Sequence, residues 1–107
     1  MGELTLGIVD DGRALDARPG TMIVIELPEN PTTGFRWSLR SKLEPVLTRK
    51  SDTFQSPAEA PPGAGGSRRF EFTASARGEA SILLWNWREW EGDGSVEKRY
   101  RVTITVK

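Results

Sequence analysis

Residues 96–107, VEKRYRVTITVK, alternate apolar and polar side chains along most of their length. Successive side chains of a β-strand point to opposite faces, so this period of two predicts a strand with one face in a core and the other in water. The residues that would share the buried face are the even-numbered ones, and all but Lys98 are apolar: Val96, Tyr100, Val102, Ile104 and Val106.

The same alternation recurs toward the N-terminus, in short segments that glycine and proline separate. The chain contains 11 Gly and 7 Pro, and the stretches between them predict six further strands. Residues 21–27 and 80–87 have apolar side chains on both faces of the predicted strand, which is typical of a strand at the centre of a sheet. The six predicted strands are residues 4–8, 21–27, 35–40, 46–54, 69–74 and 80–87.

About seven short strands in roughly 100 residues, without a helix longer than one turn, are typical of a sandwich of two antiparallel sheets. We therefore expect an all-β fold, an immunoglobulin-like Greek-key β-sandwich. It would lack the disulfide, because the chain contains no Cys. The length of 107 residues fits one domain, residues 1–107, with one core. Trp37 matches the tryptophan that such sandwiches bury, and we expect it in the core.

The absence of both Cys and His excludes most active-site chemistry. Triads of the Ser-His-Asp or Cys-His type and zinc–thiolate sites cannot form, so we expect no enzyme, no cofactor and no metal site. Carboxylate pairs such as Glu89 and Glu91 remain as candidates for acid–base chemistry, and solvated surface charge explains them better.

Charge and hydropathy exclude two further classes of partner. The chain carries 15 Lys+Arg against 15 Asp+Glu, whereas nucleic-acid binders show a basic excess, so we expect no nucleic acid. No apolar run approaches the ~20 residues that span a bilayer, and we expect no membrane insertion. The sequence shows no signal peptide, which fits a cytoplasmic protein, or a periplasmic or secreted one whose precursor lost a signal.

The first unusual loop is residues 30–35, NPTTGF, between two predicted strands. Pro31 fixes one backbone angle, and Gly34 permits a positive φ or the close approach of a partner. One interpretation is a stiff tip that presents Thr32 and Thr33 to a partner. The other is a rigid connection whose hydroxyls cap its own backbone.

The second unusual loop ends in residues 63–66, GAGG. Glycine exposes the backbone, so a partner could pair there by strand addition, although simple flexibility explains a glycine-rich loop as well. A phosphate cradle would need a helix N-terminus after the glycines. A predicted strand follows instead, so we exclude a nucleotide site.

The third unusual loop is residues 88–94, REWEGDG. Trp90 lies among charges and glycines, so we expect it to be exposed, and an exposed Trp beside Arg88 is the composition of an interface hot spot. Trp85 lies within a predicted strand, and we expect it in the core. Trp87 stands at the base of the loop, where the sequence leaves its burial open.

The strand order places all three loops at one end of the sandwich. In this order they resemble the motifs of the chagasin-type inhibitors of papain-like cysteine peptidases: Asn-Pro-Thr-Thr-Gly-aromatic, then Gly-x-Gly-Gly, then Arg-Pro-aromatic. The third motif differs from the family pattern in Glu89, which stands where the family has Pro. The matching residues are Asn30, Pro31, Thr32, Thr33, Gly34 and Phe35 in the first loop, Gly63, Ala64, Gly65 and Gly66 in the second, and Arg88 and Trp90 in the third.

The resemblance implies a reversible, non-covalent inhibitor that inserts the loops at 30–35, 63–66 and 88–94 as a wedge into the cleft of a papain-like cysteine peptidase. The first loop would lie near the catalytic thiolate, the second would pair by main-chain hydrogen bonds, and the third would pack on the opposite side. Such a wedge works as a monomer. The alternative is a non-inhibitory β-sandwich module for carbohydrate binding or adhesion that uses Trp87 and Trp90 as a platform.

Overall fold

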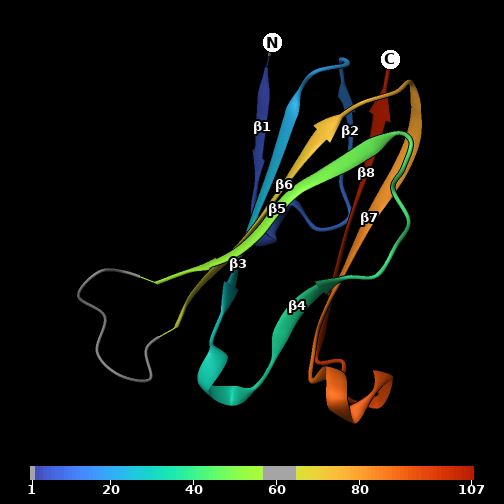
Figure 1. The fold of residues 1–107 in the computed structure, drawn as a ribbon. Coiled ribbons are helices and arrows are strands. Elements are labelled where there is room, and N and C mark those ends of the chain that lie inside the picture. The colour runs from blue at the N-terminus through green and yellow to red at the C-terminus, as the bar shows by residue number, and fades with distance from the viewer. Residues whose placement is uncertain (1, 57–64) are drawn as a thin grey trace.

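The computed structural model describes residues 2–56 and 65–107, which form two packed four-stranded sheets (Figure 1). One sheet has the strand order β1-β3-β6-β5 and the other β2-β8-β7-β4. The all-β, immunoglobulin-like sandwich predicted from the sequence is therefore confirmed. The strands are β1 (Glu3–Leu6), β2 (Ala14–Ala17), β3 (Met22–Glu29), β4 (Arg36–Leu39), β5 (Leu47–Gln55), β6 (Gly66–Ala74), β7 (Gly78–Trp87) and β8 (Lys98–Val106).

The strand that the sequence did not predict is β2, which brings the number in the described residues to eight. Its four residues, ALDA, are too few to show an alternation, and β2 pairs in parallel with the distant β8. Four 3-10 turns complete the fold, and none of the described helices is long and apolar enough to cross a membrane. The 3-10 turns are η1 (Ile8–Asp10), η2 (Pro31–Thr33), η3 (Glu89–Glu91) and η4 (Asp93–Ser95).

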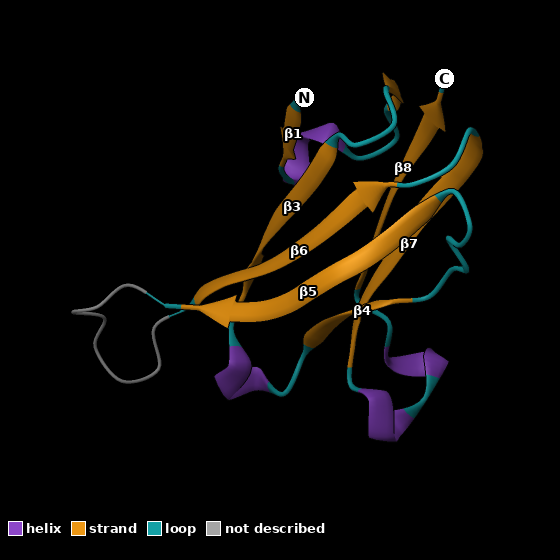
Figure 2. Ribbon diagram, turned by 45° about the horizontal axis from the view of Figure 1, so that its top comes forward, coloured by secondary structure: helices purple, strands orange, loops and turns teal. Residues whose placement is uncertain are grey.

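Antiparallel pairing brings three connections to one end of the sandwich. Glu29 at the end of β3 pairs with Gly66 at the start of β6, and Arg36 at the start of β4 pairs with Trp87 at the end of β7. The turns η2, η3 and η4 therefore lie at the same end of the molecule (Figure 2). We call it the loop end.

The core fills the space between the sheets with side chains of the inward parity. Trp37 is 1% exposed, which confirms its predicted burial, and its ring meets that of Tyr100 edge to face at 6.5 Å. The Tyr100 hydroxyl donates to the carbonyl of Gly7 at 2.9 Å, so its polar end is satisfied. The fully buried residues around them include Ile23, Ile25, Leu27, Leu47, Phe70, Phe72, Ile82, Leu84, Val102 and Ile104.

The prediction that Trp85 belongs to the core is wrong. Ile82 and Leu84 point into the core, so Trp85 and Trp87 extend from the outer face of β7. Trp87 is only 6% exposed and nevertheless lies outside the core cluster, because Trp85 and Arg40 cover it. Strand β7 is thus apolar on both faces for two different reasons. Its inner face lies in the core, and its outer face is covered by side chains of the same sheet.

Replacing Phe72 with alanine tests the core. Phe72 is fully buried and stacks beside Phe70 with ring centroids 6.3 Å apart. We expect Phe72→Ala to lower the free energy of unfolding by about 3–5 kcal/mol, measured by urea denaturation. Val9→Ala is the control, since Val9 is 87% exposed and its change should stay within about 0.5 kcal/mol. Equal effects of the two substitutions would contradict the packing described here.

Candidate functional site

The first loop closes on itself through a network of hydrogen bonds. The Asn30 Oδ1 atom accepts from the backbone N–H of Thr32 at 3.1 Å and from the Thr32 hydroxyl at 2.7 Å. The Thr33 hydroxyl donates to the carbonyl of Asn30 at 2.8 Å and accepts from the N–H of Phe35 at 3.3 Å. Capping of the loop backbone by its own hydroxyls is therefore confirmed. Because both threonines also remain exposed, the loop is at once rigid and accessible.

The third loop clamps the first through Arg88. Its Nε and Nη2 atoms donate to the carbonyl of Thr33 at 3.1 and 3.0 Å, and its guanidinium lies 4.5 Å from the centre of the Phe35 ring. A guanidinium can do both at once, because its edge donates while its face stacks on an aromatic ring. Residues 55 positions apart in the chain are thereby held together.

Trp90 completes the contact between the two loops, and at 72% exposure it confirms the predicted accessibility. A Cβ atom on Gly34 would lie only 2.9 Å from the Trp90 Cη2 atom, and Gly34 has a φ of 81°. Both the positive φ and the close ring require glycine at this position. The Cη2–Cζ2 edge of the indole therefore lies against the first loop, while most of the side chain is open to solvent.

Ser95 holds the third loop, which lacks the proline of the family motif. Its hydroxyl accepts from the N–H of Arg88 at 3.1 Å and lies 2.9 Å and 2.7 Å from the carbonyl oxygens of Arg88 and Gly92. Arg88 also lies 3.5 Å from the carboxylate of Glu91. Sequence reasoning missed Ser95, because a lone serine beyond a glycine-rich turn carries no distinctive signal.

The glycines of the second loop divide between the loop and the sheet. Gly65 is exposed, and a Cβ on it would approach the carbonyl of Glu29 to 3.4 Å. Gly66 belongs to β6 and pairs with Glu29, and a Cβ there would overlap the carbonyl oxygen of Gln55. Gly66 is therefore required for close packing inside the sheet. Gly63 and Ala64 lie outside the described residues.

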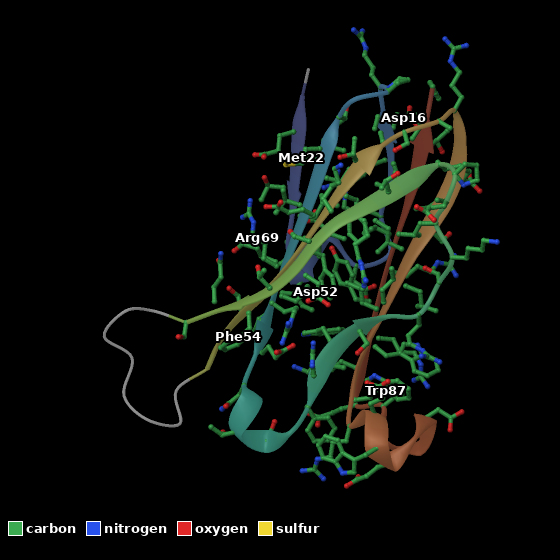
Figure 3. The ribbon with its side chains drawn as sticks, in the orientation of Figure 1. Asp16, Met22, Asp52, Phe54, Arg69 and Trp87 are labelled. Atoms are coloured by element: carbon green, nitrogen blue, oxygen red, sulfur yellow. The ribbon has the colours of Figure 1, made fainter. Side chains whose placement is uncertain are left out.

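Beneath the first and second loops lies a buried ion pair that the sequence reasoning did not identify. The Glu29 side chain is 1% exposed, and its Oε1 atom lies 2.7 Å from the Arg68 Nη2 atom. Arg68 also reaches Asp52 at 3.0 Å and packs against the ring of Phe54 (Figure 3). Burial disfavours the charged guanidinium, but hydrogen bonds to Glu29 and Asp52 outweigh it and raise the pKa of Arg68.

Glu29 connects this pair to the base of the first loop. Its Oε2 atom accepts from the backbone N–H of Trp37 at 2.8 Å, and the Trp37 indole donates to the carbonyl of Pro28 at 2.9 Å. The carboxylate of Glu29, which precedes the first loop, thus holds the backbone of Trp37, which follows it. The sequence did contain a signal, since Glu29 and Arg68 both fall on the inward parity of their strands, next to Leu27 and Phe70.

A cleft of about 470 Å³ lies at the bases of the three loops. Asn86 lines it, and the Oδ1 atom of this residue is buried without a hydrogen-bond partner. Within residues 2–56 and 65–107 no cluster of three or more Asp or Glu side chains could hold a metal ion. The remaining lining residues include Pro28, Asn30, Thr33, Phe35, Gly65, Arg88, Glu97 and Lys98.

The structure argues against the alternative platform of Trp87 and Trp90. A sugar-stacking platform needs exposed aromatic faces, but Trp87 is 6% exposed and packs edge to face against Trp85 with centroids 5.3 Å apart. Among the described aromatic residues, Trp90 alone is exposed. The two tryptophans therefore do not form one surface.

Comparison with known proteins places the chain beside a family of peptidase inhibitors. The model of a family described as chagasin family peptidase inhibitor I42 matches residues 16–104. Chagasin from Trypanosoma cruzi is 33% identical over 99 residues, which cover 88% of this chain and 89% of that protein.

Solved structures share the fold at low sequence identity. The cysteine protease inhibitor EhICP2 from Entamoeba histolytica matches with a TM-score of 0.85 and 19% identity, covering 99% of this chain and 96% of that one. PbICP-C, whose structure was solved in complex with falcipain-2, matches with a TM-score of 0.70 and 15% identity over the whole of both chains.

Removing the Glu29 carboxylate tests the buried ion pair. We expect Glu29→Ala to cost about 3–5 kcal/mol of unfolding free energy, because it leaves the Arg68 charge buried with a weaker partner. The Asp52 side chain is 24% exposed, so Asp52→Ala should cost about 1 kcal/mol or less. Urea denaturation of both variants measures the difference. A Glu29→Ala cost no larger than that of Asp52→Ala would show that the pair does not anchor the loops.

Proposed function

Because the chain belongs to the chagasin family of peptidase inhibitors, we propose that it blocks papain-like cysteine peptidases reversibly, by inserting the three loops of its loop end as a wedge into the active-site cleft. An inhibitor of this family is not an enzyme. The names of the matched proteins support this target class, since the solved structures similar to this chain include the cysteine protease inhibitor EhICP2 and PbICP-C in complex with falcipain-2.

The observation that carries the proposal is the interlock of the first and third loops. Arg88 donates twice to the Thr33 carbonyl, and the Trp90 ring contacts Gly34. The two loops are therefore held in one arrangement in the free protein. Loops that are already ordered lose little conformational entropy on binding, and more of the contact energy appears as affinity. The interlock therefore supplies the preorganisation that a tight inhibitor needs.

The conformation of the first loop explains how it could occupy a peptidase cleft without being cleaved. Residues Pro31–Thr33 form a 3-10 turn, whereas a peptide that binds by strand addition is extended. Cleavage requires the peptidase thiolate to attack a peptide carbonyl, and here the Thr33 carbonyl is held by two donors from Arg88, while the Thr32 and Thr33 hydroxyls are engaged within the loop. Inhibition by this loop requires contact alone and forms no bond.

The flanking loops would widen the contact on both sides of the first. Gly65 offers an exposed backbone without a side chain, and Trp90 offers a large apolar surface beside the Arg88 guanidinium. Together with residues 30–35 they would form an interface of about 1,600 Å² in total, the usual size for such complexes. One copy of the chain supplies all three loops, so the inhibitor acts as a monomer.

The direct test is an inhibition assay. We expect the purified protein to inhibit several papain-like cysteine peptidases at equimolar concentration, measured with a fluorogenic peptide substrate. Electrophoresis after prolonged incubation should show the inhibitor uncleaved. Full peptidase activity across the whole panel would refute the proposed function.

Trp90→Ala tests the contribution of the third loop. We expect the inhibition constant to rise about 30-fold or more, as loss of a hot-spot tryptophan costs about 2 kcal/mol. The melting temperature should change little, since Trp90 is 72% exposed. An unchanged inhibition constant would remove Trp90 from the interface, and a large loss of melting temperature would assign it a structural role instead.

A further inference from the structure

The outer face of the sheet β2-β8-β7-β4 carries a cluster of arginine and tryptophan side chains. Register places Arg36 of β4 opposite Trp87 of β7, and Trp85 of β7 opposite Arg99 of β8. Arg40, just beyond β4, reaches the same rings. We call these five residues the arginine–tryptophan face.

Two of the three guanidinium groups of this face, those of Arg40 and Arg99, stack on the tryptophan rings. The Arg40 guanidinium lies 4.9 Å from the Trp85 ring centre and 4.7 Å from that of Trp87, and Arg99 lies 5.6 Å from Trp85. Stacking uses the flat face of a guanidinium and leaves the N–H groups at its edge available. The indole N–H groups of Trp85 and Trp87 are buried, so the donors that this face offers to a partner belong to its exposed arginines, whose guanidinium groups carry no acceptor.

The positive charge of the face is not neutralised within the described part of the chain. Arg36, Arg40 and Arg99 are exposed and form neither an ion pair nor a side-chain hydrogen bond there. The nearby carboxylate of Glu97, the residue before β8, pairs with none of them.

The outer face of the opposite sheet shows the contrasting arrangement. There Arg69 lies between two carboxylates, 2.6 Å from Glu26 and 2.8 Å from Glu71. Arg69 is therefore neutralised by its neighbours whereas the arginines of the arginine–tryptophan face are not, although the 15 basic and 15 acidic residues of the chain balance. The zero net charge conceals this difference between the faces.

The position of the arginine–tryptophan face beside the loop end indicates which partner would contact it. Arg36 directly follows Phe35, whose ring is stacked by Arg88 of the third loop, so the arginine–tryptophan face begins where the wedge ends. A peptidase that receives the wedge would bring the surface beside its cleft up to this face. Guanidinium edges are the complement of carboxylates, so a matching surface would be acidic.

We propose that the arginine–tryptophan face is a second contact region for the target peptidase, and that it selects enzymes with a carboxylate-rich surface beside the cleft. This inference rests on the proposed inhibitory function. Charges at the rim of an interface act mainly on the association rate and on its salt dependence, while the wedge determines how long the complex lasts.

The test compares two double variants that remove equal charge. Arg36→Gln/Arg99→Gln alters the arginine–tryptophan face, and Arg49→Gln/Lys50→Gln alters two exposed residues of β5 in the other sheet. Association rate constants are measured by stopped flow, at low and physiological ionic strength, against one papain-like peptidase with an acidic surface beside the cleft and one with a basic surface there.

For the acidic peptidase we expect the first double variant to associate about 3- to 10-fold more slowly at low salt, with a weaker salt dependence. The control variant should change the rate less than twofold. For the basic peptidase the first variant should associate as fast as the unaltered protein or faster. In every case the dissociation rate should change little.

Two results would overturn the inference. Equal effects of the two double variants, or no effect of either, would mean that the face has no role in association. Retention on a heparin column that the first variant alone loses, with unchanged peptidase association, would assign the face to a polyanion instead. Failure of the unaltered protein to inhibit any peptidase would refute the proposed function itself, so the two failures are distinguishable.

Discussion

The carboxylate of Glu29 lies at the point where the hydrophobic core of the sandwich ends and the loops begin. It pairs with Arg68 across β3 and β6 and accepts from the backbone of Trp37 on β4, so a single side chain joins both sheets beneath the first loop. An unpaired charge at 1% exposure would be costly, and this cost restricts the loop bases to the arrangement that keeps the pair intact. Apolar contacts also hold the two sheets together, but they fix the position of the loop bases less closely than the hydrogen bonds of Glu29 do. Hydrophobic burial depends on the area removed from water and only weakly on orientation.

Beyond the Glu29 carboxylate, the loops are held by polar contacts and by a close approach that only glycine, at Gly34, permits. The Asn30 side chain and the Thr33 hydroxyl satisfy backbone groups of the first loop, and Arg88 adds two donors from the third. Gly34 lets the Trp90 ring lie where a Cβ atom would collide. Family inhibitors carry proline after the arginine, whereas here Ser95 ties the third loop through its hydroxyl. The wedge is therefore stiff for reasons that a motif comparison alone would not reveal.

Much of the fold could be predicted from the sequence, because period-two alternation reports which face of a strand is buried. The strand predicted within residues 96–107 is observed as Lys98–Val106, and Trp37 is buried as predicted. The failures have specific causes. The strand β2 has four residues and gains its hydrogen bonds from β8, far along the chain, so no local pattern marks it. Trp85 is apolar and lies in a central strand, yet it extends outward, and its environment is made by Arg40 and Arg99 from other strands.

The sequence by itself determined the strand pattern, the absence of thiol and imidazole chemistry, and the three motifs that identify the family. These depend on residue type and on local spacing, which a linear chain displays directly. Only the tertiary structure decided that Arg88 donates to Thr33, that Glu29 pairs with Arg68, and that three arginines with no ion pair among the described residues gather on one outer face. Such contacts join residues as far apart as Arg88 and Thr33, 55 positions along the chain, and they exist because strand pairing and sheet packing bring distant side chains within a few ångströms.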